Sequence, residues 1–244
     1  MDDNYIIKPV ARIYTDFSER FGIPRQSGLI PELTARIIFE KDFRDKNAVR
    51  GIEEFSHLWL IWGFSETCID MSSEHIQWSP TVAPPRLGGN IRKGVFSTRS
   101  PYRPNSLGLS SVRLISVDYD HPESPVLNVG GADILDGSPV FDIKPYIPYS
   151  DIHPDARGGF SVSDESFLKV NFPDELIKSI PADKRNALLK VLSQDPRGSY
   201  EKQPGYVYGL RFAGYDIRFT VNCGVLDVFE VINSDTAGIS GKIK

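Results

Sequence analysis

Residues 57–62 read HLWLIW, an almost unbroken apolar run that contains two tryptophans. A strand with one face in a core and the other in water alternates apolar and polar residues, and this run does not. We therefore expect a strand that is buried on both faces, as in a barrel wall covered by another subunit or domain. Closing the sheet into a barrel would also remove its exposed edges.

The first 150 residues around this run have a β-rich pattern. Short segments with β-branched and aromatic residues alternate there with Gly, Pro and Asp, and helical periodicity is nearly absent. The expected strands are Lys8–Tyr14, Arg36–Phe39, His57–Phe64, Lys93–Thr98, Leu109–Tyr119 and Val126–Leu135.

A cluster of Pro, Asp and Gly at 148–159 predicts a linker or a long surface loop. We place a domain boundary there, with one domain in residues 1–152 and a second in 153–244. The second domain is expected to be a small α+β unit in an otherwise mainly β chain. Its expected elements are a strand at Ser166–Phe172, a helix at Pro181–Ser193, and a meander of Tyr206–Phe212, Tyr215–Val221 and Val225–Ile232.

Composition and missing motifs narrow the classes of function. The 244-residue chain has a net charge of −4 and lacks the usual glycine-rich nucleotide, hydrolase and paired-cysteine signatures. Its four histidines have no metal-ligand spacing, so no metal is expected. Cys68 and Cys223 are expected to be free and reduced. Because no run reaches the roughly 18 apolar residues of a membrane span and the start lacks a secretory signal, we expect a cytoplasmic protein.

Positive charge is concentrated in Pro84–Ser111, PPRLGGNIRKGVFSTRSPYRPNSLGLSS. No Asp or Glu occurs between Glu74 and Asp118. Cations set among glycines, prolines and the aromatics Phe96 and Tyr102 are typical of a surface that meets a polyanion or a charged cofactor. A solvated positive face is the alternative. The cations are Arg86, Arg92, Lys93, Arg99 and Arg103.

Two glycine-flanked segments are candidates for ligand contact. In GIPRQSG, residues 22–28, Arg25 and Gln26 offer a planar cation and an amide, although the segment also suits a surface turn. In GGADILDGSP, Asp133 and Asp136 can accept hydrogen bonds from ribose hydroxyls or pair with an ammonium group. The alternative is that Asp136 simply belongs to a turn.

The segment DIKPYIPY, residues 142–149, is stiffened by two prolines. Its Tyr146 and Tyr149 either stack on a nucleic-acid base or pack against the prolines.

Taken together, these segments resemble the TrmO/TsaA-like (YaeB/VirR-type) family of tRNA methyltransferases. The similar segments are PVARIYT, GIPRQSGL, VRGIEEFSHLWLIWGF, the basic run, GGADILDGSPVFDIKPYIPYSD, SQDPRGSY and the final meander. The resemblance implies a single-sheeted β-barrel that binds S-adenosylmethionine without a Rossmann domain, forms a homodimer, and precedes a small α+β domain that contacts tRNA. The implied reaction is methylation of the N6 nitrogen of N6-threonylcarbamoyladenosine, next to the anticodon.

Carried over residue by residue, the resemblance implies cofactor contacts in four parts of the chain. Bacterial members of the family have His-Gln where this chain has Ser65-Glu66, so backbone rather than side-chain contacts are expected at that pair. The implied contacts are Pro24, Arg25, Gln26, Ser65, Glu66, Arg99, Leu107, Asp133, Ile134, Leu135 and Asp136.

Methyl transfer from a sulfonium is an in-line displacement that depends mainly on positioning. We take as hypotheses that Asp142 accepts the proton of the carbamoyl-bearing nitrogen and that Asn105 orients the urea-like group. Arg103 is a candidate partner of the threonyl carboxylate, and Tyr146 a candidate for base stacking. The expected phosphate contacts are Arg86, Arg92, Lys93 and Arg197.

Two other classes of function compete with this interpretation. A non-catalytic tRNA-binding barrel, or a sensor that binds S-adenosylmethionine, would show the same basic run and tyrosines. A hydrolase is the third possibility, although no spacing in the sequence suggests a catalytic triad.

Overall fold

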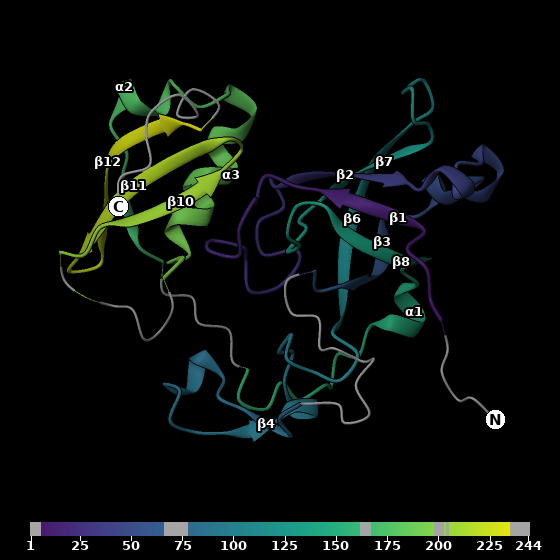
Figure 1. Cartoon of the computed structure of the whole chain (residues 1–244), viewed down its shortest axis with the longest axis horizontal. Helices are drawn as coiled ribbons and strands as arrows, with labels where there is room; N and C mark the ends of the chain where they lie inside the picture. The colour runs from purple at the N-terminus through teal and green to yellow at the C-terminus, as the bar shows by residue number, and fades with distance from the viewer. Residues whose placement is uncertain (1–5, 66–77, 162–166, 198–202, 204, 235–244) are drawn as a thin grey trace.

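The computed structural model describes residues 6–65, 78–161, 167–197, 203 and 205–234, and it contains two large β-sheets (Figure 1). The strands are β1 Ala11–Tyr14, β2 Thr34–Phe39, β3 His57–Gly63, β4 Thr81–Val82, β5 Lys93–Gly94, β6 Leu107–Asp118, β7 Val126–Gly130, β8 Ser138–Pro145, β9 Lys169–Asn171, β10 Tyr208–Phe212, β11 Tyr215–Asn222 and β12 Val225–Asn233. The α-helices are α1 Pro148–Asp151, α2 Asp174–Ile177 and α3 Ala182–Ser193. Short 3-10 helices lie at Lys41–Phe43, Lys46–Val49, Ile52–Glu54, Pro85–Leu87 and Val95–Ser97.

The first sheet is a closed antiparallel barrel. Its strands pair in the order β1-β2-β7-β6-β3-β8, and β8 returns to β1, where Ile13 lies opposite Ser138. Every strand therefore has two neighbours, which confirms the expected single-sheeted barrel and removes free edges.

The apolar strand β3 lies in this wall between β6 and β8. Its side chains alternate, so that Leu58, Leu60 and Trp62 are buried in the barrel core while Trp59 and Ile61 face outward and are half-buried. The outward face of β3 continues onto β6, where Leu109 lies opposite Ile61 and is 59% exposed. The expectation that a partner covers this face is not tested by a single chain.

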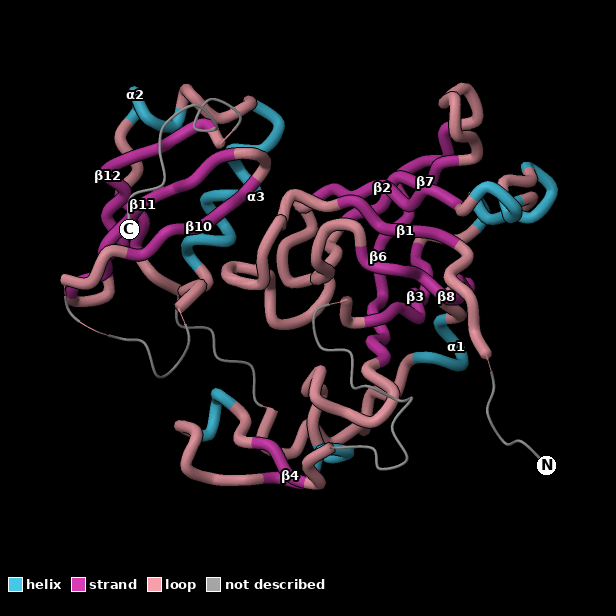
Figure 2. The backbone as a smooth tube through the Cα atoms, in the orientation of Figure 1, coloured by secondary structure: helices cyan, strands magenta, loops and turns pink. Residues whose placement is uncertain are grey.

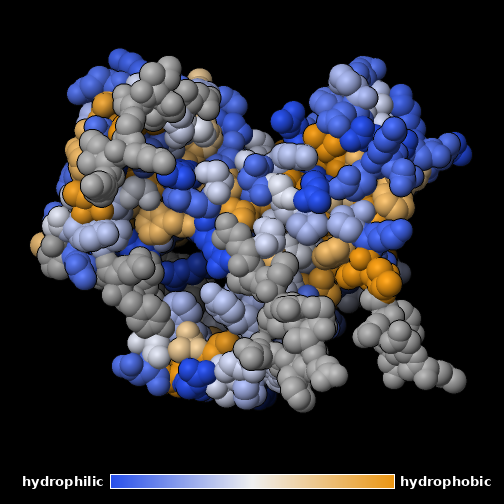
Figure 3. Space-filling view, viewed as in Figure 1, coloured by the Kyte–Doolittle hydropathy of each residue, from blue (hydrophilic) through white to orange (hydrophobic). Residues whose placement is uncertain are grey.

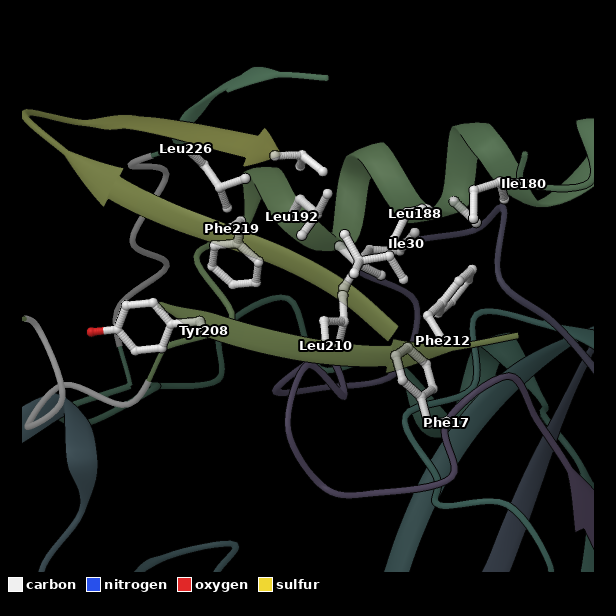
Figure 4. Close-up of a cluster of buried hydrophobic side chains, with 14 of the residues drawn as sticks. Phe17, Ile30, Ile180, Leu188, Leu192, Tyr208, Leu210, Phe212, Phe219 and Leu226 are labelled. Atoms are coloured by element: carbon white, nitrogen blue, oxygen red, sulfur yellow. The ribbon is translucent and has the colours of Figure 1, made fainter. Parts of the chain in front are cut away.

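The second sheet has the order β10-β11-β12-β9, with β9 parallel to β12. Both hairpin turns occur where the sequence predicts them, because Ala213-Gly214 and Cys223-Gly224 adopt the positive φ angles of tight hairpins. Helix α3 buries Ala187, Leu188, Val191 and Leu192 against this sheet (Figure 4). The expected helix and meander are thus confirmed.

The loop between β1 and β2, residues 15–33, connects the barrel to the second sheet. Figure 2 shows this loop, in pink, between the two sheets. Phe17 and Ile30 from the loop are buried in the C-terminal core, and the Phe17 ring meets the Phe212 ring edge-on at 5.4 Å (Figure 4). An ion pair of 2.7 Å joins Lys184 of α3 to Asp16 of the loop. The two cores are therefore held together by side chains that precede β2.

Three sequence expectations about strands need correction. Lys93–Thr98 is a strand only at Lys93–Gly94, because Val95–Ser97 turns into a 3-10 helix. The strand expected at Val126–Leu135 ends at Gly130, because Gly131 takes a φ of 77° that extended chain does not adopt.

Strand β8 is not among the expected strands, and its Pro139 and Pro145 give it a sequence that is unusual for a strand with neighbours on both sides. Both prolines lie near the ends of the strand, where the missing backbone N–H is tolerated.

The division into domains at residues 152 and 153 remains a prediction. No helix in the described part of the chain is long and apolar enough to cross a membrane.

Candidate functional site

A cavity of about 510 Å³ opens at one end of the barrel. It is bounded by the loop at residues 23–27, the end of β3, the start of β6, the loop that follows β7, and residues 98–103 of the basic run. Its size lies within the usual range for pockets that hold a small organic ligand.

Asp133 ends a hydrogen-bond chain that starts inside the barrel. The Trp62 Nε1–H donates to Ser110 Oγ at 3.0 Å, and the Ser110 hydroxyl donates to Asp133 Oδ1 at 2.6 Å. Gly108 makes room for the indole ring, because a Cβ at that position would lie 2.3 Å from it. The three polar groups come from β3, β6 and the loop after β7, so barrel closure brings them together.

Burial raises the pKa of Asp133 above its ordinary value. The hydrogen bonds from Ser110 and from the Ser27 backbone N–H, together with the charge of Arg99, act in the opposite direction without outweighing burial. A half-buried carboxylate of this kind is stabilised when a cation binds beside it. It is the one carboxylate among the described residues that line the cavity.

The loop at residues 23–27 is held against the barrel by backbone contacts. Gly28 N–H donates to the Gly131 carbonyl at 2.8 Å, and the Ser111 N–H of β6 donates to Ser27 Oγ at 3.2 Å. These bonds place Pro24, Arg25 and Gln26 along one side of the cavity.

Several arginines also line the cavity. The Arg99 guanidinium donates to Gln26 Oε1 and so bridges the basic run and the loop. Arg103 donates to the Thr98 carbonyl at 3.1 Å and lies 6.0 Å from the Phe96 ring centre. Arg20 also lines the cavity. Their positive charge favours anionic groups of a ligand.

Apolar and aromatic side chains line the rest of the cavity. Trp62 and Phe64 have ring centres 4.4 Å apart, and Trp59 reaches the rim from the outer face of β3. The Trp59 Nε1–H donates to Asp151 Oδ2 at 2.9 Å, which fixes this ring against α1. The cavity thus joins an anion, several cations and a flat apolar surface.

Most of the residues expected to contact the cofactor lie together in this cavity. Glu66 lies outside the described residues. The expected residues that line the cavity are Pro24, Arg25, Gln26, Ser65, Arg99, Leu107, Asp133 and Leu135, and Arg103 lies among them.

Ile134 and Asp136 do not line the cavity. The Ile134 side chain is fully buried in the barrel core. Asp136 turns to the other side of the loop, where its Oδ1 accepts the Thr15 N–H at 2.8 Å and it shares a second hollow with Asp183 and Lys184. The sequence showed two equivalent carboxylates, and the turn that follows Ile134 separates them.

The two residues proposed for catalysis also lie outside the cavity lining. Asn105 is exposed on the loop that leads into β6. Asp142 lies opposite Ile61 on the outer face of the barrel and pairs with Lys144 at 2.7 Å. An irregularity in the pairing of β8 with β3 precedes Asp142 and sets this direction. Neither residue is placed to reach a ligand in this cavity of a single chain.

The expected RNA contacts are divided in the structure. Arg92 is exposed on the β4–β5 hairpin and Lys93 is half-buried beside it, whereas the side chain of Arg86 is outside the described part. Tyr146 is half-buried and packs on Trp59, with ring centres 5.5 Å apart.

The expected phosphate contact of Arg197 needs correction, because this residue is only 7% exposed. Its guanidinium donates to both carboxylate oxygens of Asp195, at 2.7 and 2.9 Å, and lies over the Tyr208 ring. It is therefore committed to the C-terminal core rather than to phosphate.

Sequence reasoning missed several residues that line the cavity. Trp62 was assigned to the barrel wall alone, and the serines of β6 carry no motif that marks them. Only the strand register, in which Leu60 lies opposite Ser110, shows that Ser110 comes between Trp62 and Asp133. The missed residues that matter most are Arg20, Ser27, Trp59, Trp62, Phe64 and Ser110. Within the described residues, no group of three His, Cys, Asp or Glu side chains is arranged to hold a metal ion.

Comparison of the chain with known proteins identifies its family. Residues 12–152 match the model of the tRNA-methyltransferase O N-terminal domain, and residues 165–234 match that of the TrmO C-terminal domain. The chain belongs to the TrmO family. It is 37% identical to the tRNA (adenine(37)-N6)-methyltransferase of Escherichia coli over 93% of this chain and 97% of that protein.

Two further relatives agree with membership of the TrmO family. A putative S-adenosylmethionine-dependent methyltransferase of Pseudomonas aeruginosa, RcsF, is 34% identical over 87% of this chain and 91% of its own length. The crystal structure of TrmO from Pseudomonas aeruginosa superposes with a TM-score of 0.73 at 29% identity, covering 93% of this chain and 98% of that one. The TrmO fold thus extends over both sheets.

Proposed function

We propose that this protein transfers a methyl group from S-adenosylmethionine to the N6 nitrogen of adenine 37 in tRNA, and that its acceptor is N6-threonylcarbamoyladenosine. The coarse activity, an S-adenosylmethionine-dependent tRNA methyltransferase, follows from family membership and the names of the relatives. The observation that carries the proposal is a single cavity lined by Asp133, by several arginines and by aromatic rings. The compartment that we propose is the cytoplasm, where tRNA is modified and used.

The chemistry of the cavity fits this cofactor. S-adenosylmethionine has a sulfonium and an ammonium, a carboxylate, two ribose hydroxyls and an adenine ring. The lining supplies a carboxylate whose ionisation is disfavoured until a cation binds, arginines for a carboxylate, and apolar rings for adenine. The volume of about 510 Å³ is also adequate.

Three groups of residues would hold the cofactor. Asp133 would neutralise its positive end, Arg99 with Gln26 would bind its carboxylate, and the surface of Leu107 and Trp62 would receive its apolar part. Bound there, the cofactor supplies an electrophilic methyl group. The contribution of the protein is to orient the acceptor nitrogen and to exclude water, since the displacement needs no covalent intermediate on the chain.

The acceptor adds an anion of its own, because threonylcarbamoyladenosine carries a free carboxylate. Arg103 lines the cavity through a guanidinium anchored on Thr98 and is the proposed partner for that carboxylate. Arg92 and Lys93, which precede Arg103 in the basic run, are the proposed contacts for anticodon-loop phosphates. Residues 153–244 are proposed to form a separate domain that contacts the rest of the tRNA.

We also propose that the working unit is a homodimer. The outward faces of β3 and β6 present Trp59, Ile61 and Leu109 in one patch, and Leu109 is 59% exposed in the single chain. Because Trp59 and Leu109 also line the cavity, a second copy on this patch would complete the wall of the site.

The test is a methyl-transfer assay. Purified protein and S-adenosylmethionine are incubated with tRNA that contains N6-threonylcarbamoyladenosine, with unmodified tRNA as the control, and digested nucleosides are weighed by mass spectrometry. We expect one methyl mass on the threonylcarbamoylated nucleoside and none on plain adenosine.

The alternative outcomes separate the other possibilities. Methylation of both tRNAs would keep the activity and remove the requirement for the threonylcarbamoyl group. Cofactor binding by calorimetry without any methylated nucleoside would contradict the transferase proposal and favour a sensor.

A further inference from the structure

An arm formed by residues 78–103 extends from the barrel and carries an unusual exposure of aromatic rings. Figure 1 shows its strand β4 well apart from both large sheets. The Phe96 residue is 71% exposed and Trp78 is 39% exposed, and exposed apolar side chains that lie together are more informative than single ones. Their ring centres are 5.9 Å apart, so they form one continuous surface.

The backbone holds Phe96 outward. Its neighbour Val95 is only 1% exposed, and the Val95 N–H donates to the Pro80 carbonyl at 2.9 Å. Thr98 closes the turn by donating its hydroxyl to the Val95 carbonyl at 2.8 Å. Because Val95 is anchored inward, the 3-10 helix at Val95–Ser97 presents Phe96 to solvent in a preorganised position.

Within the described residues 78–103, the charged side chains around these rings are cations. Arg103 lies 6.0 Å from the Phe96 ring centre and also lines the cavity, so one side chain connects the rings to the site. Arg92 is held on the hairpin by bonds to Thr81 Oγ1 at 2.7 Å and to the Thr81 carbonyl at 2.5 Å. Residues 78–103 contain no Asp or Glu, and Figure 3 shows hydrophilic and hydrophobic residues side by side at the bottom of the view, where the arm lies.

We propose that Trp78 and Phe96 form a stacking platform for an unpaired base of the tRNA loop that neighbours the target adenosine. The inference rests on the proposed function and adds to it the residues that hold the flanking nucleotide. Exposed aromatic rings interleaved with cations are the usual surface for single-stranded nucleic acid, since every base has a face that stacks and every nucleotide has a phosphate.

A second copy of the chain is a poorer occupant of this surface. In a two-fold contact the same patch lies on both partners, so the arms would bring two all-basic segments together. An anionic partner with flat apolar groups avoids that repulsion.

The first experiment measures the affinity of a fluorescently labelled anticodon stem–loop by anisotropy, without cofactor. We expect Phe96→Ala to weaken binding by about 5- to 100-fold, and Phe96→Tyr to bind like the wild type because it restores the ring. Phe43→Ala is the matched control, because Phe43 is an exposed phenylalanine (41%) on a 3-10 helix of the barrel. It should have no effect on RNA affinity.

Salt dependence distinguishes stacking from phosphate contact. Phe96→Ala should leave the slope of log affinity against log salt unchanged, whereas Arg92→Ala should reduce it by about one. Affinity for S-adenosylmethionine should be unchanged in Phe96→Ala, because neither platform ring lines the cavity. RNA should also quench tryptophan fluorescence in the wild type, and Trp78→Phe, which keeps Trp59 and Trp62 of the cavity, should reduce that quenching.

The outcomes are distinct. If the wild type binds RNA and Phe96→Ala binds it equally well, the platform is overturned while the proposed function stands. If Phe96→Ala instead weakens self-association in sedimentation experiments and leaves RNA affinity unchanged, the rings belong to a protein interface and the platform is again overturned. If the wild type neither binds RNA nor methylates it, the inference fails together with the proposed function.

Discussion

Asp133 and Asp136 show how much one turn changes the role of a side chain. Both follow the same pair of glycines, yet Asp133 lines the cavity and accepts a hydrogen bond from Ser110. Asp136 does not line the cavity and accepts the Thr15 N–H instead. Burial raises the pKa of Asp133 above its ordinary value. Its proton is therefore bound more tightly in the folded protein than in the unfolded chain.

The sign of this shift determines the effect on stability. Above the raised pKa, ionised Asp133 lowers the stability of the ligand-free protein, and that loss disappears as the pH falls from the raised pKa toward the unfolded value. A bound cation has the opposite preference, because it attracts only the ionised form.

We predict that Asp133→Asn weakens S-adenosylmethionine binding about tenfold or more at neutral pH, because it removes the charge while keeping an acceptor for Ser110. Calorimetry without tRNA measures this affinity, which in the wild type should also fall as the pH drops through the raised pKa. The melting temperature of the ligand-free variant should not decrease. Asp136→Asn is the control and should bind normally; a greater loss in that control would contradict the assignment.

At the scale of elements, the strands confirmed from sequence are those in which the signal is local. Strand β1 alternates buried Ala11 and Ile13 with exposed Arg12 and Tyr14, a period that the sequence displays directly. Strand β8 was not predicted, because its two prolines fit a strand only at their particular positions in the barrel. The local sequence does not show those positions.

Gly131 holds the loop at residues 23–27 against the barrel, since its carbonyl accepts the Gly28 N–H. Its φ is 77°, and a Cβ there would lie 3.2 Å from both Cα and N of Gly28. Gly137 has a similar φ of 73°, but a Cβ at that position would meet no other atom within 4 Å. An alanine at either glycine strains the backbone, but only an alanine at Gly131 also displaces the loop.

We predict that Gly131→Ala and Gly137→Ala each lower the free energy of unfolding by about 1–2 kcal/mol, the usual penalty for a left-handed alanine. Only Gly131→Ala should also reduce cofactor affinity, by severalfold, because the loop at residues 23–27 must move. Denaturant titration and calorimetry give the two quantities. Equal cofactor affinity in the two variants would show that the loop does not depend on this contact.

On the scale of the whole molecule, two cores share one loop. Phe17, Ile30 and Leu33 lie in the loop at residues 15–33 yet belong to the C-terminal core, and Asp16 of the same loop pairs with Lys184 of α3. Burial raises the pKa of Asp16, whereas the hydrogen bond and the charge of Lys184 favour its ionised form. Residues 23–27 of this loop also line the cavity. The C-terminal core therefore supports one wall of the cavity through the loop.

The outer patch of β3 and β6 leads to a prediction about assembly. We expect the wild type to sediment at twice the mass of a single chain, and Leu109→Lys to weaken the dimer at least tenfold, because it places a charge in the apolar patch. Phe229→Lys is the control, since Phe229 is 49% exposed on β12, away from the patch. A monomeric wild type at micromolar concentration would contradict the homodimer.

The chain alone specified the features that depend on near neighbours. Periods of two and 3.6 residues placed most strands and helix α3, and glycine-containing turns divided the meander. The basic run predicted a surface that meets an anion. The family resemblance supported the barrel already suggested by residues 57–62 and added the cofactor, and most of the residues it implied do line one cavity.

Closure of the barrel settled the rest. It placed Ser110 between Trp62 and Asp133 and turned Asp136 and Asp142 away from the cavity. The physical reason is that strand register and side-chain direction depend on pairing between residues far apart in the chain. A stretch of sequence shows which residues are polar, but only the paired strands show what each polar group faces.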